Sequence, residues 1–242
     1  MITASTPLTS TSTSGTVLVQ EQQITRADLL AMLADTPAQR LHFEHCDFDG
    51  ADLSGLALQG AQFTGCSLAE ASLARAQLGD TRWLGCRARQ ASFHLAHLTD
   101  ARFHHCDLNN TLWTKATLAS ALFAEVKLTA AQFHEAQTLG LSFHDTLLVG
   151  ADLRGISFRK QTIEQLDMSD ADISGCDFRD AVFEGGSLRD AHLKNARFDG
   201  ADLRSVDLGG LRLAQLAQSF KGAILSTDQA ALLVSELGIR VM

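Results

Sequence analysis

The sequence of 242 residues contains no tyrosine and only two prolines, Pro7 and Pro37, both of which precede Leu41. A proline removes a backbone hydrogen-bond donor, so its absence from the rest of the chain permits an uninterrupted ladder of backbone hydrogen bonds. No apolar run reaches the length of a membrane-spanning helix. With 45% apolar residues, the chain is predicted to bury a core of its own.

Motifs that carry catalysis or bind nucleotides are also missing. The sequence has no G-x-S-x-G, no H-E-x-x-H, no phosphate-binding loop and no dinucleotide-binding fingerprint. Its five cysteines include no C-x-x-C pair, and its nine histidines show no zinc-ligand spacing. We therefore predict a protein that is not an enzyme and that holds neither a metal nor a cofactor. The odd number of cysteines and the lack of a secretory signal peptide favour a reducing, cytoplasmic setting.

Positive charge is scarce, because 20 lysines and arginines stand against 28 acidic residues, a formal net charge of -8. Direct binding to nucleic acid or to an anionic membrane requires basic patches, so neither is a predicted partner. The charge favours a basic partner, or a protein site that normally receives a polyanion.

What the chain has in abundance is a period of five. From Leu41 to Leu213 almost every fifth residue is large and apolar, as in Phe43, Phe48 and Leu53, and a small residue usually stands two positions before it. A period of five fits neither the 3.6 residues of a helical turn nor the alternation of a strand. A short period over most of a chain is typical of a solenoid. Two positions in five then point inward, and three, where glycine and charge gather, point outward.

Several repeats follow the pattern A-[DN]-L-x-x, for example residues 51–55 and 151–155. This pattern resembles the pentapeptide-repeat family, and the resemblance implies an all-β solenoid, a right-handed quadrilateral β-helix with four pentapeptides per coil. The residues agree with a 20-residue coil, because Cys46 and Cys66 begin a series of four cysteines at that spacing. Aromatic residues recur at the same spacing from Phe43 to Phe143. We therefore expect columns of like side chains inside about nine coils.

Four segments are predicted along the chain. Residues 1–22 form a disordered tail rich in serine and threonine, and residues 23–40 form a capping helix, with Thr25 as its N-cap, and a linker. Residues 41–225 form the β-helix. Residues 226–242 contain a second helix that begins at Thr227 or Asp228 and either folds back on the last coil or pairs with a second chain.

The repeat is weakest at residues 136–147, where Thr138 stands in place of a large apolar residue and Leu139 and Leu147 occupy outward positions. We predict a bulge or a bent junction between two subdomains there. With Val149, the outward apolar residues indicate either a contact patch or simply irregular packing.

Most of the excess negative charge is predicted to lie on two neighbouring faces of the coil. These faces form an acidic stripe, which either keeps the protein soluble or binds a protein that normally clamps a DNA duplex with lysine and arginine. The stripe residues chosen as candidates are Asp47, Asp49, Glu70, Asp107, Glu125, Asp145, Asp167, Asp170, Asp190 and Asp207.

The run from Asp228 to Ile239 resembles the C-terminal helix of Qnr-type quinolone-resistance proteins, which ends in a similar Q-A-x-L-L-x-x-L-G-I run. The resemblance implies a tail-to-tail homodimer that mimics B-form DNA and engages DNA gyrase. Such relatives protect gyrase from quinolones or from peptide toxins such as microcin B17 and albicidin. The residues predicted to form the dimer contact are Ala230, Leu233, Val234, Leu237 and Ile239.

The leading prediction is therefore a non-catalytic DNA mimic that binds DNA gyrase or a related type II topoisomerase and protects it from an inhibitor. The alternative, from another class, is a structural or secreted protein-interaction module without a topoisomerase role. The serine- and threonine-rich first residues and the additional N-terminal helix favour the alternative.

Overall fold

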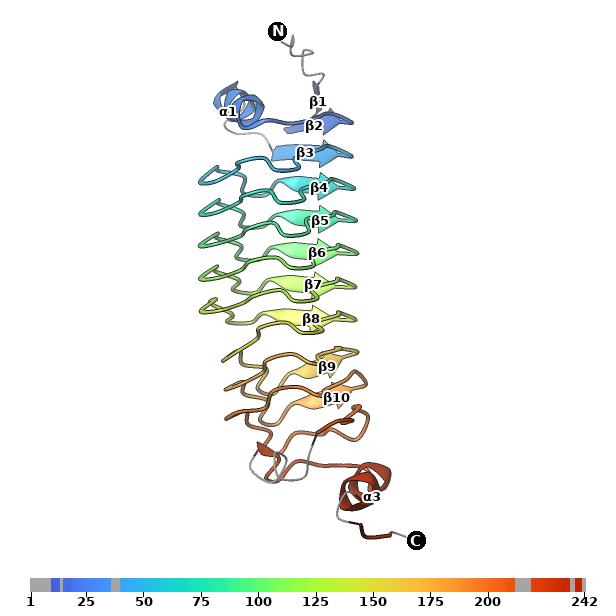
Figure 1. Ribbon diagram of the computed structural model, residues 1–242. Helices are drawn as coiled ribbons and strands as arrows, with labels where there is room; N and C mark the ends of the chain where they lie inside the picture. Colours follow the sequence, from blue (N-terminus) through green and yellow to red (C-terminus); the bar gives the residue numbers. More distant parts are fainter. Residues whose placement is uncertain (1–9, 14, 36–39, 212–218, 236–237, 241–242) are drawn as a thin grey trace.

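The computed structural model describes residues 10–13, 15–35, 40–211, 219–235 and 238–240. Ten strands form one sheet in chain order along a rod, with a helix near each end (Figure 1). The strands are β1 (Ser10–Thr13), β2 (Thr16–Gln20), β3 (Arg40–Glu44), β4 (Gln62–Thr64), β5 (Arg82–Leu84), β6 (Arg102–His104), β7 (Leu122–Ala124), β8 (Ser142–His144), β9 (Thr162–Glu164) and β10 (Val182–Glu184). The helices are α1 (Arg26–Asp35) and α3 (Thr227–Ser235), and no helix in the described ranges could cross a membrane.

Residues 20 apart pair from turn to turn, which confirms the predicted coil. Phe43 lies opposite Phe63 in the sheet, and bridges at the same spacing begin at Asp47, Asp52 and Ala57 on the other sides. Each turn is therefore four-sided. Strands β3 to β10 contribute one strand to each turn, so the described residues form about eight full turns, where the sequence predicted about nine.

Turns and sides are numbered as follows. Turn 1 begins at residue 41, turn 2 at residue 61 and turn 3 at residue 81, and the later turns follow at the same interval. Side 1 carries strands β3 to β10, and in turn 1 sides 2, 3 and 4 begin at residues 46, 51 and 56. At the end of each side, the residue whose number is a multiple of five forms a corner, and nearly all of these residues have a positive φ. Glycine adopts that conformation without strain, which explains why glycine recurs there.

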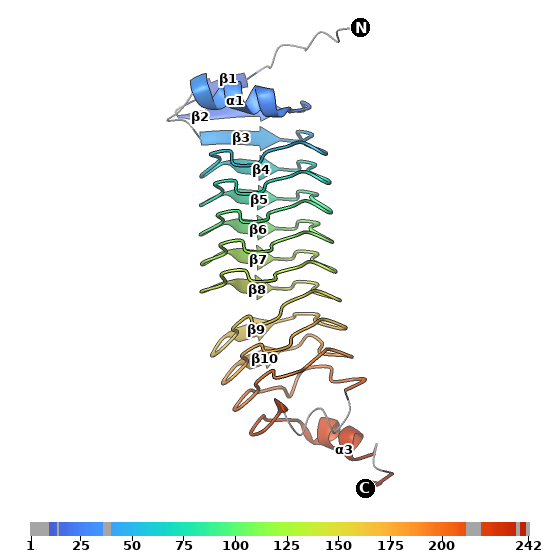
Figure 2. The same ribbon diagram turned by 60° about the vertical axis from the view of Figure 1, so that its left-hand side comes forward.

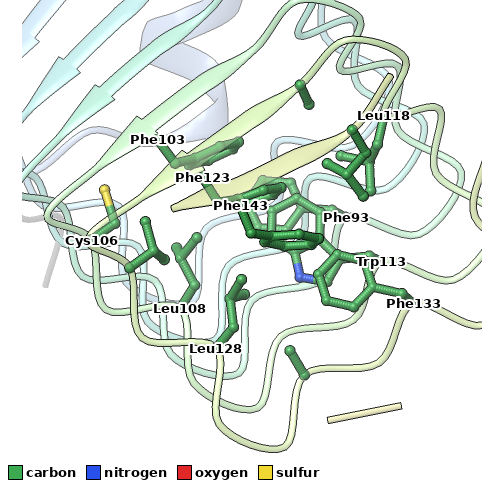
Figure 3. Packing of buried hydrophobic residues seen from close by; sticks show 14 of the residues in the cluster. Phe93, Phe103, Cys106, Leu108, Trp113, Leu118, Phe123, Leu128, Phe133 and Phe143 are labelled. Atoms are coloured by element: carbon green, nitrogen blue, oxygen red, sulfur yellow. The ribbon is translucent and has the colours of Figure 1, made fainter. Parts of the chain in front are cut away.

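The core consists of stacked columns, as the spacing predicted. The aromatic rings of the column from Phe43 to Phe143 on side 1 stack with centroids 4.0 to 5.4 Å apart. A second column on side 3, formed by Phe93, Trp113 and Phe133, was not predicted, and its rings meet the first column edge-on (Figure 3). Stacked and edge-on pairs each contribute about 0.5 to 1.5 kcal/mol beyond their buried area.

Both tryptophans are satisfied by a threonine two positions earlier. The Trp113 Nε1–H donates to Thr111 Oγ1 at 2.8 Å, and the Thr111 hydroxyl donates to the Leu108 carbonyl at 2.6 Å. Thr81 serves Trp83 in the same way, with an Nε1 to Oγ1 distance of 3.0 Å. Two residues before an inward centre the chain usually has alanine or cysteine. Where the centre is a tryptophan, threonine stands there instead, because an unpaired buried indole N–H would be costly.

The N-terminal cap is larger than predicted. The expectation of a disordered tail through residue 22 is wrong for β2, which pairs in parallel with β3, and β1 pairs antiparallel with β2 (Figures 1 and 2). Val17 and Val19 are buried, so strand β2 extends the apolar interior beyond turn 1. The predicted helix is present as α1, and the Asp28 N–H donates to Thr25 Oγ1 at 3.3 Å, which confirms Thr25 as the N-cap.

The hydrogen-bond ladder opens at one place on the rod. In the described chain, the Phe133 N–H still donates to the Asp152 carbonyl and the Asp145 N–H to the Glu164 carbonyl. Between these points, residues 135–141 and 154–162 lack the backbone bonds to each other that equivalent residues make in the preceding turns. Strands β8 and β9 keep a single residue pair, and the ribbon shows a wider gap between them (Figure 1).

Side-chain size accounts for this opening. Thr138 is too small for an inward centre, whereas Leu141 and Gln161 are larger than the alanines that occupy their column in turns 2, 4 and 5. The Gln161 side-chain amide donates to the Leu141 carbonyl at 3.3 Å, where a backbone N–H donates in other turns. The outward leucines form no common patch, because Leu139 lies on side 4 and Leu147 on side 2.

The coil also changes before α3. Asp202 pairs with Ile224 instead of Gly222, the partner that the regular spacing would give. The predicted five-residue phase ran only to Leu213, and the residues of the predicted β-helix beyond it pair with the coil out of that phase. The described part of the coil in phase ends at Leu211.

Candidate functional site

Most of the outward acidic residues of the coil fall into two structural groups. Those directly before an inward centre accept a hydrogen bond from the backbone N–H two positions later, as Asp47 does from Asp49 at 2.8 Å and Asp167 from Ser169 at 3.0 Å. This Asx turn helps the chain round the next corner. Those at a corner have a positive φ and project from the rod.

Four of the ten predicted stripe residues belong to the first group. They are Asp47, Asp107, Asp167 and Asp207. Two of them also pair with arginine, since Arg89 Nη2 lies 2.6 Å from Asp107 Oδ2 and Arg189 Nη2 lies 2.8 Å from Asp207 Oδ2. The Gly209 N–H and then Arg189 lower the pKa of Asp207. These carboxylates stabilise the coil, and a partner cannot engage them fully without competing with those bonds.

Two further candidates are also engaged within the chain. Asp49 Oδ1 accepts bonds from the Ser67 hydroxyl at 2.6 Å and the Ala69 N–H at 2.7 Å, so it joins turn 1 to turn 2. Glu125 lies 3.1 Å from His105. Both side chains remain exposed.

The remaining four candidates are exposed corner residues: Glu70, Asp145, Asp170 and Asp190. Their carboxylates make no hydrogen bond or ion pair with any other described residue. Asp170 and Asp190 occupy the same corner in turns 7 and 8, and Asp145 lies in turn 6 at the corner between sides 1 and 2. Glu70 is five turns from Asp170, about 24 Å along the rod. The structure therefore brings three free carboxylates together near the C-terminal end and leaves Glu70 apart.

A basic segment interrupts the predicted stripe. Turns 3 and 4, residues 81–120, carry five arginines and lysines against two aspartates, although the whole chain is acidic. Arg82, Arg87 and Arg102 lie on the two faces to which the stripe was assigned, and all three are exposed. The prediction missed this segment because it summed charge along each face. Counting charge turn by turn would have found it.

At the C-terminal end, Gln229 anchors α3 to the last turn. Its Nε2 donates to the carbonyls of Leu203 and Val206, both at 2.8 Å, while its Oε1 accepts the Ser226 N–H at 2.7 Å. The Gln229 N–H donates to Ser226 Oγ at 3.2 Å, which completes a capping box. The helix begins at Thr227, one of the two predicted starts, and the S-x-x-Q pattern at residues 226–229 was the signal in the sequence for its cap.

The predicted dimer residues do not all face outward. Leu233 is 7% exposed and joins the core of its own chain, whereas its neighbour Leu232, which was not predicted, is 61% exposed. Ala230 and Ile239 are exposed, Val234 is half-buried, and Leu237 lies outside the described residues. The helix therefore folds back on the last coil, and Leu232 is exposed at the groove between α3 and residues 206–211.

The cysteines are core residues. All five are buried and free, and the Cys66, Cys86 and Cys176 thiols each donate to a carbonyl in the preceding turn. Burial raises the pKa of Cys176 to about 12, so its reactive thiolate is scarce at neutral pH. Within the described ranges, no three His, Cys, Asp or Glu side chains gather as metal ligands would.

Comparisons with known proteins agree with this geometry. A family model described as "Pentapeptide repeat region" matches residues 36–113 and 56–133, and one described as "Pentapeptide repeats (8 copies)" matches residues 142–185 and 176–213. The unmatched residues between them, 134–141, lie where the ladder opens. No curated protein matches the sequence.

Among solved structures, a trypsin-treated form of QnrB1, a plasmid-mediated fluoroquinolone resistance protein, is similar with a TM-score of 0.72 and 21% identity. The match covers 83% of this chain and 99% of that one. Full-length QnrB1 is similar with a TM-score of 0.68 and 22% identity, over 78% of this chain and 97% of that one. At this identity the likeness establishes the fold.

Proposed function

Because the chain belongs to the pentapeptide-repeat family, we propose that it is a non-catalytic mimic of DNA that binds DNA gyrase or a related type II topoisomerase and protects it from an inhibitor. The inhibitor is a peptide toxin, such as albicidin or microcin B17, or a quinolone. Support comes from the fold shared with a fluoroquinolone resistance protein and from the free carboxylates at the corners of turns 6 to 8. The second of these observations carries the proposal.

The contact is confined to the C-terminal part of the rod. Asp145, Asp170 and Asp190 are exposed and unpaired among the described residues, so a basic partner can desolvate them without breaking bonds in the coil. Lysine and arginine that normally contact phosphates would engage these corners. The basic segment of turns 3 and 4 repels the lysines and arginines of the partner, so the contact ends before that segment.

A tail-to-tail homodimer would double this acidic region. From turn 6 to Leu211 each chain contributes about three and a half turns, or about 17 Å at roughly 4.8 Å per turn. Two chains joined through α3 would place about 34 Å of acidic rod at the centre of the dimer. One helical turn of DNA is about 34 Å long, so the region is long enough to occupy a duplex-binding site.

The exposed apolar residues of α3 and of the segment after it supply the dimer contact in this proposal. Leu232 and Ile239 are exposed apolar residues that a second chain would cover. Leu232→Asp should convert a dimer into a monomer by light scattering and leave the fold intact. Leu233→Asp cannot separate these effects, because Leu233 is buried in its own chain. A wild-type protein that is monomeric at micromolar concentration would refute the dimer.

The first functional test is a gyrase supercoiling assay with the purified protein, alone and with albicidin, microcin B17 or ciprofloxacin. We expect supercoiling to be restored in the presence of one of these inhibitors. The combined variant Asp145→Asn, Asp170→Asn and Asp190→Asn should need at least tenfold more protein for the same rescue. Asparagine tolerates the positive φ of these corners, so the coil is preserved.

The matched control removes the same charge from sides 3 and 4. It combines Asp52→Asn, Asp172→Asn and Asp199→Asn, and it should rescue supercoiling as the wild type does. Equal loss in both triple variants would show that net charge alone matters. If the wild type neither inhibits nor rescues gyrase at micromolar concentration, the proposed function is wrong.

A further inference from the structure

A shallow groove of about 320 Å³ lies on side 1, across strands β4, β5 and β6. Its outward side chains form two columns, because residues in register on neighbouring strands stand side by side. The first column is Gln62, Arg82 and Arg102, and the second is Thr64, Leu84 and His104. No carboxylate lines the groove, although the protein as a whole is acidic.

Arg82 and Arg102 are the unusual pair in this groove. They are direct cross-strand partners on strands about 4.8 Å apart, and both are exposed. In the described chain, neither guanidinium has a hydrogen-bond or ion-pair partner, whereas Arg154, Arg179 and Arg204 each pair with an aspartate two positions earlier. Like charges directly opposite each other destabilise a sheet. An anion bound between the two guanidinium groups would attract both of them and would offset their repulsion.

We propose that this groove binds a phosphate group between the Arg82 and Arg102 guanidinium groups. A guanidinium presents a planar fork of donors that matches phosphate oxygens, and two stacked forks can contact different oxygens of one phosphate. The Gln62 amide stands next to Arg82 in the same column and supplies a further N–H donor.

The second column indicates what is attached to the phosphate. Leu84 is 49% exposed between the Thr64 hydroxyl and the His104 ring, so it offers an apolar contact beside the charged column. A phosphate ester has both parts, a charged group and a less polar body. The ester is either a free small molecule or the phosphodiester backbone of DNA, and the chemistry at the arginine pair is the same.

This site does not depend on the proposed gyrase contact. The groove lies in turns 2 to 4, in and beside the basic segment, whereas Asp145, Asp170 and Asp190 lie in turns 6 to 8. Loss of phosphate binding would leave the acidic corners unchanged, and failure of the supercoiling assay would leave the groove unchanged.

The test measures thermal unfolding and binding of the full chain in phosphate and in chloride at equal ionic strength and pH. Phosphate should raise the melting temperature, and it should compete with a fluorescent 12-base-pair duplex if the duplex binds. Phosphate binding to Arg82→Gln and to Arg102→Gln should be at least tenfold weaker. In chloride both variants should melt at or above the wild-type temperature, because each substitution removes the repulsion between the two guanidinium groups. A melting temperature in that range shows that the variants fold.

Arg75→Gln is the matched control, since Arg75 is an exposed arginine on the corner between sides 3 and 4. It should bind phosphate as the wild type does. Binding of phosphate alone assigns the site to a small phosphate ester, and binding of both phosphate and duplex at the same arginines assigns it to the DNA backbone. The proposal is overturned if phosphate has no effect on the wild type, or if Arg75→Gln weakens binding as much as Arg82→Gln.

Discussion

Gln229→Glu tests how α3 is held on the last turn. The substitution keeps the shape of the side chain and the acceptor for the Ser226 N–H, but it replaces the Nε2 donor with a carboxylate oxygen. That oxygen would face the Leu203 and Val206 carbonyls, which Nε2 now contacts at 2.8 Å. Two hydrogen bonds are lost and like partial charges meet, so docking of α3 should weaken by about 2 to 4 kcal/mol.

The effect should depend on pH in a defined direction. Contact with two carbonyl oxygens disfavours the charged form, so docking raises the pKa of the new carboxyl above its ordinary value of about 4.3. A raised pKa means that docking is partly restored below about pH 4.3, where the protonated carboxyl donates one hydrogen bond in place of the two from Nε2. Docking is then lost as the pH rises through the pKa of the docked form.

Amide hydrogen exchange of residues 227–235 is the assay, with each variant compared with the wild type at the same pH. Exchange of α3 in Gln229→Glu should be roughly 30- to 1000-fold faster than wild type at pH 7, as expected from a loss of about 2 to 4 kcal/mol, and the acceleration should be much smaller at pH 4. Gln90→Glu, at an exposed corner, adds the same charge and should have no effect. Unchanged exchange at pH 7, or equal acceleration at pH 4, would refute the assigned role of Gln229.

Three further predictions concern stability, measured by urea denaturation. Thr111→Val should lower the free energy of unfolding by about 1 to 3 kcal/mol because it leaves the Trp113 N–H unpaired, but by less than about 0.5 kcal/mol in a Trp113→Phe background. Equal losses in both backgrounds would contradict the hydrogen bond. Gly186→Ala should lower the free energy of unfolding by about 3 kcal/mol or more, because the new Cβ would lie 2.2 Å from a backbone oxygen, whereas Gly150→Ala, whose Cβ meets open space, should lower it by about 1 kcal/mol. Similar losses for the two variants would show that the turn adapts. The bond from Arg154 lowers the pKa of Asp152, so this pair contributes stability above about pH 3.9 that is lost as the pH falls, and Arg154→Gln should flatten the acid limb of the stability profile.

The fold was predictable because its information is local. A period of five with a 20-residue super-period places each residue on a turn and a side, and the columns of Phe43 and Cys46 follow from that arithmetic alone. Caps were partly predictable for the same reason, since Thr25 and Asp28 form a local motif. The strand β2 was missed, although Thr16–Gln20 is rich in β-branched residues, because its partner Arg40–Glu44 lies beyond an intervening helix.

The candidate site was predictable only as a set of positions. The sequence identified which carboxylates lie on two faces, but their pairing depends on side chains in the neighbouring turn, as in the bond from Arg89 to Asp107. It also could not separate Leu232 from Leu233, which are neighbours on one helix but differ in exposure.

The sequence by itself determined the coil, its four sides and the identity of the inward residues, because a repeat of fixed length imposes the same geometry wherever it recurs. Only the tertiary structure decided which carboxylates are free, where the ladder opens and which face of α3 remains exposed. Those properties arise from contacts between successive turns and from the docking of α3 on the last turn. The free energy of such contacts depends on distances between side chains that the five-residue pattern does not specify.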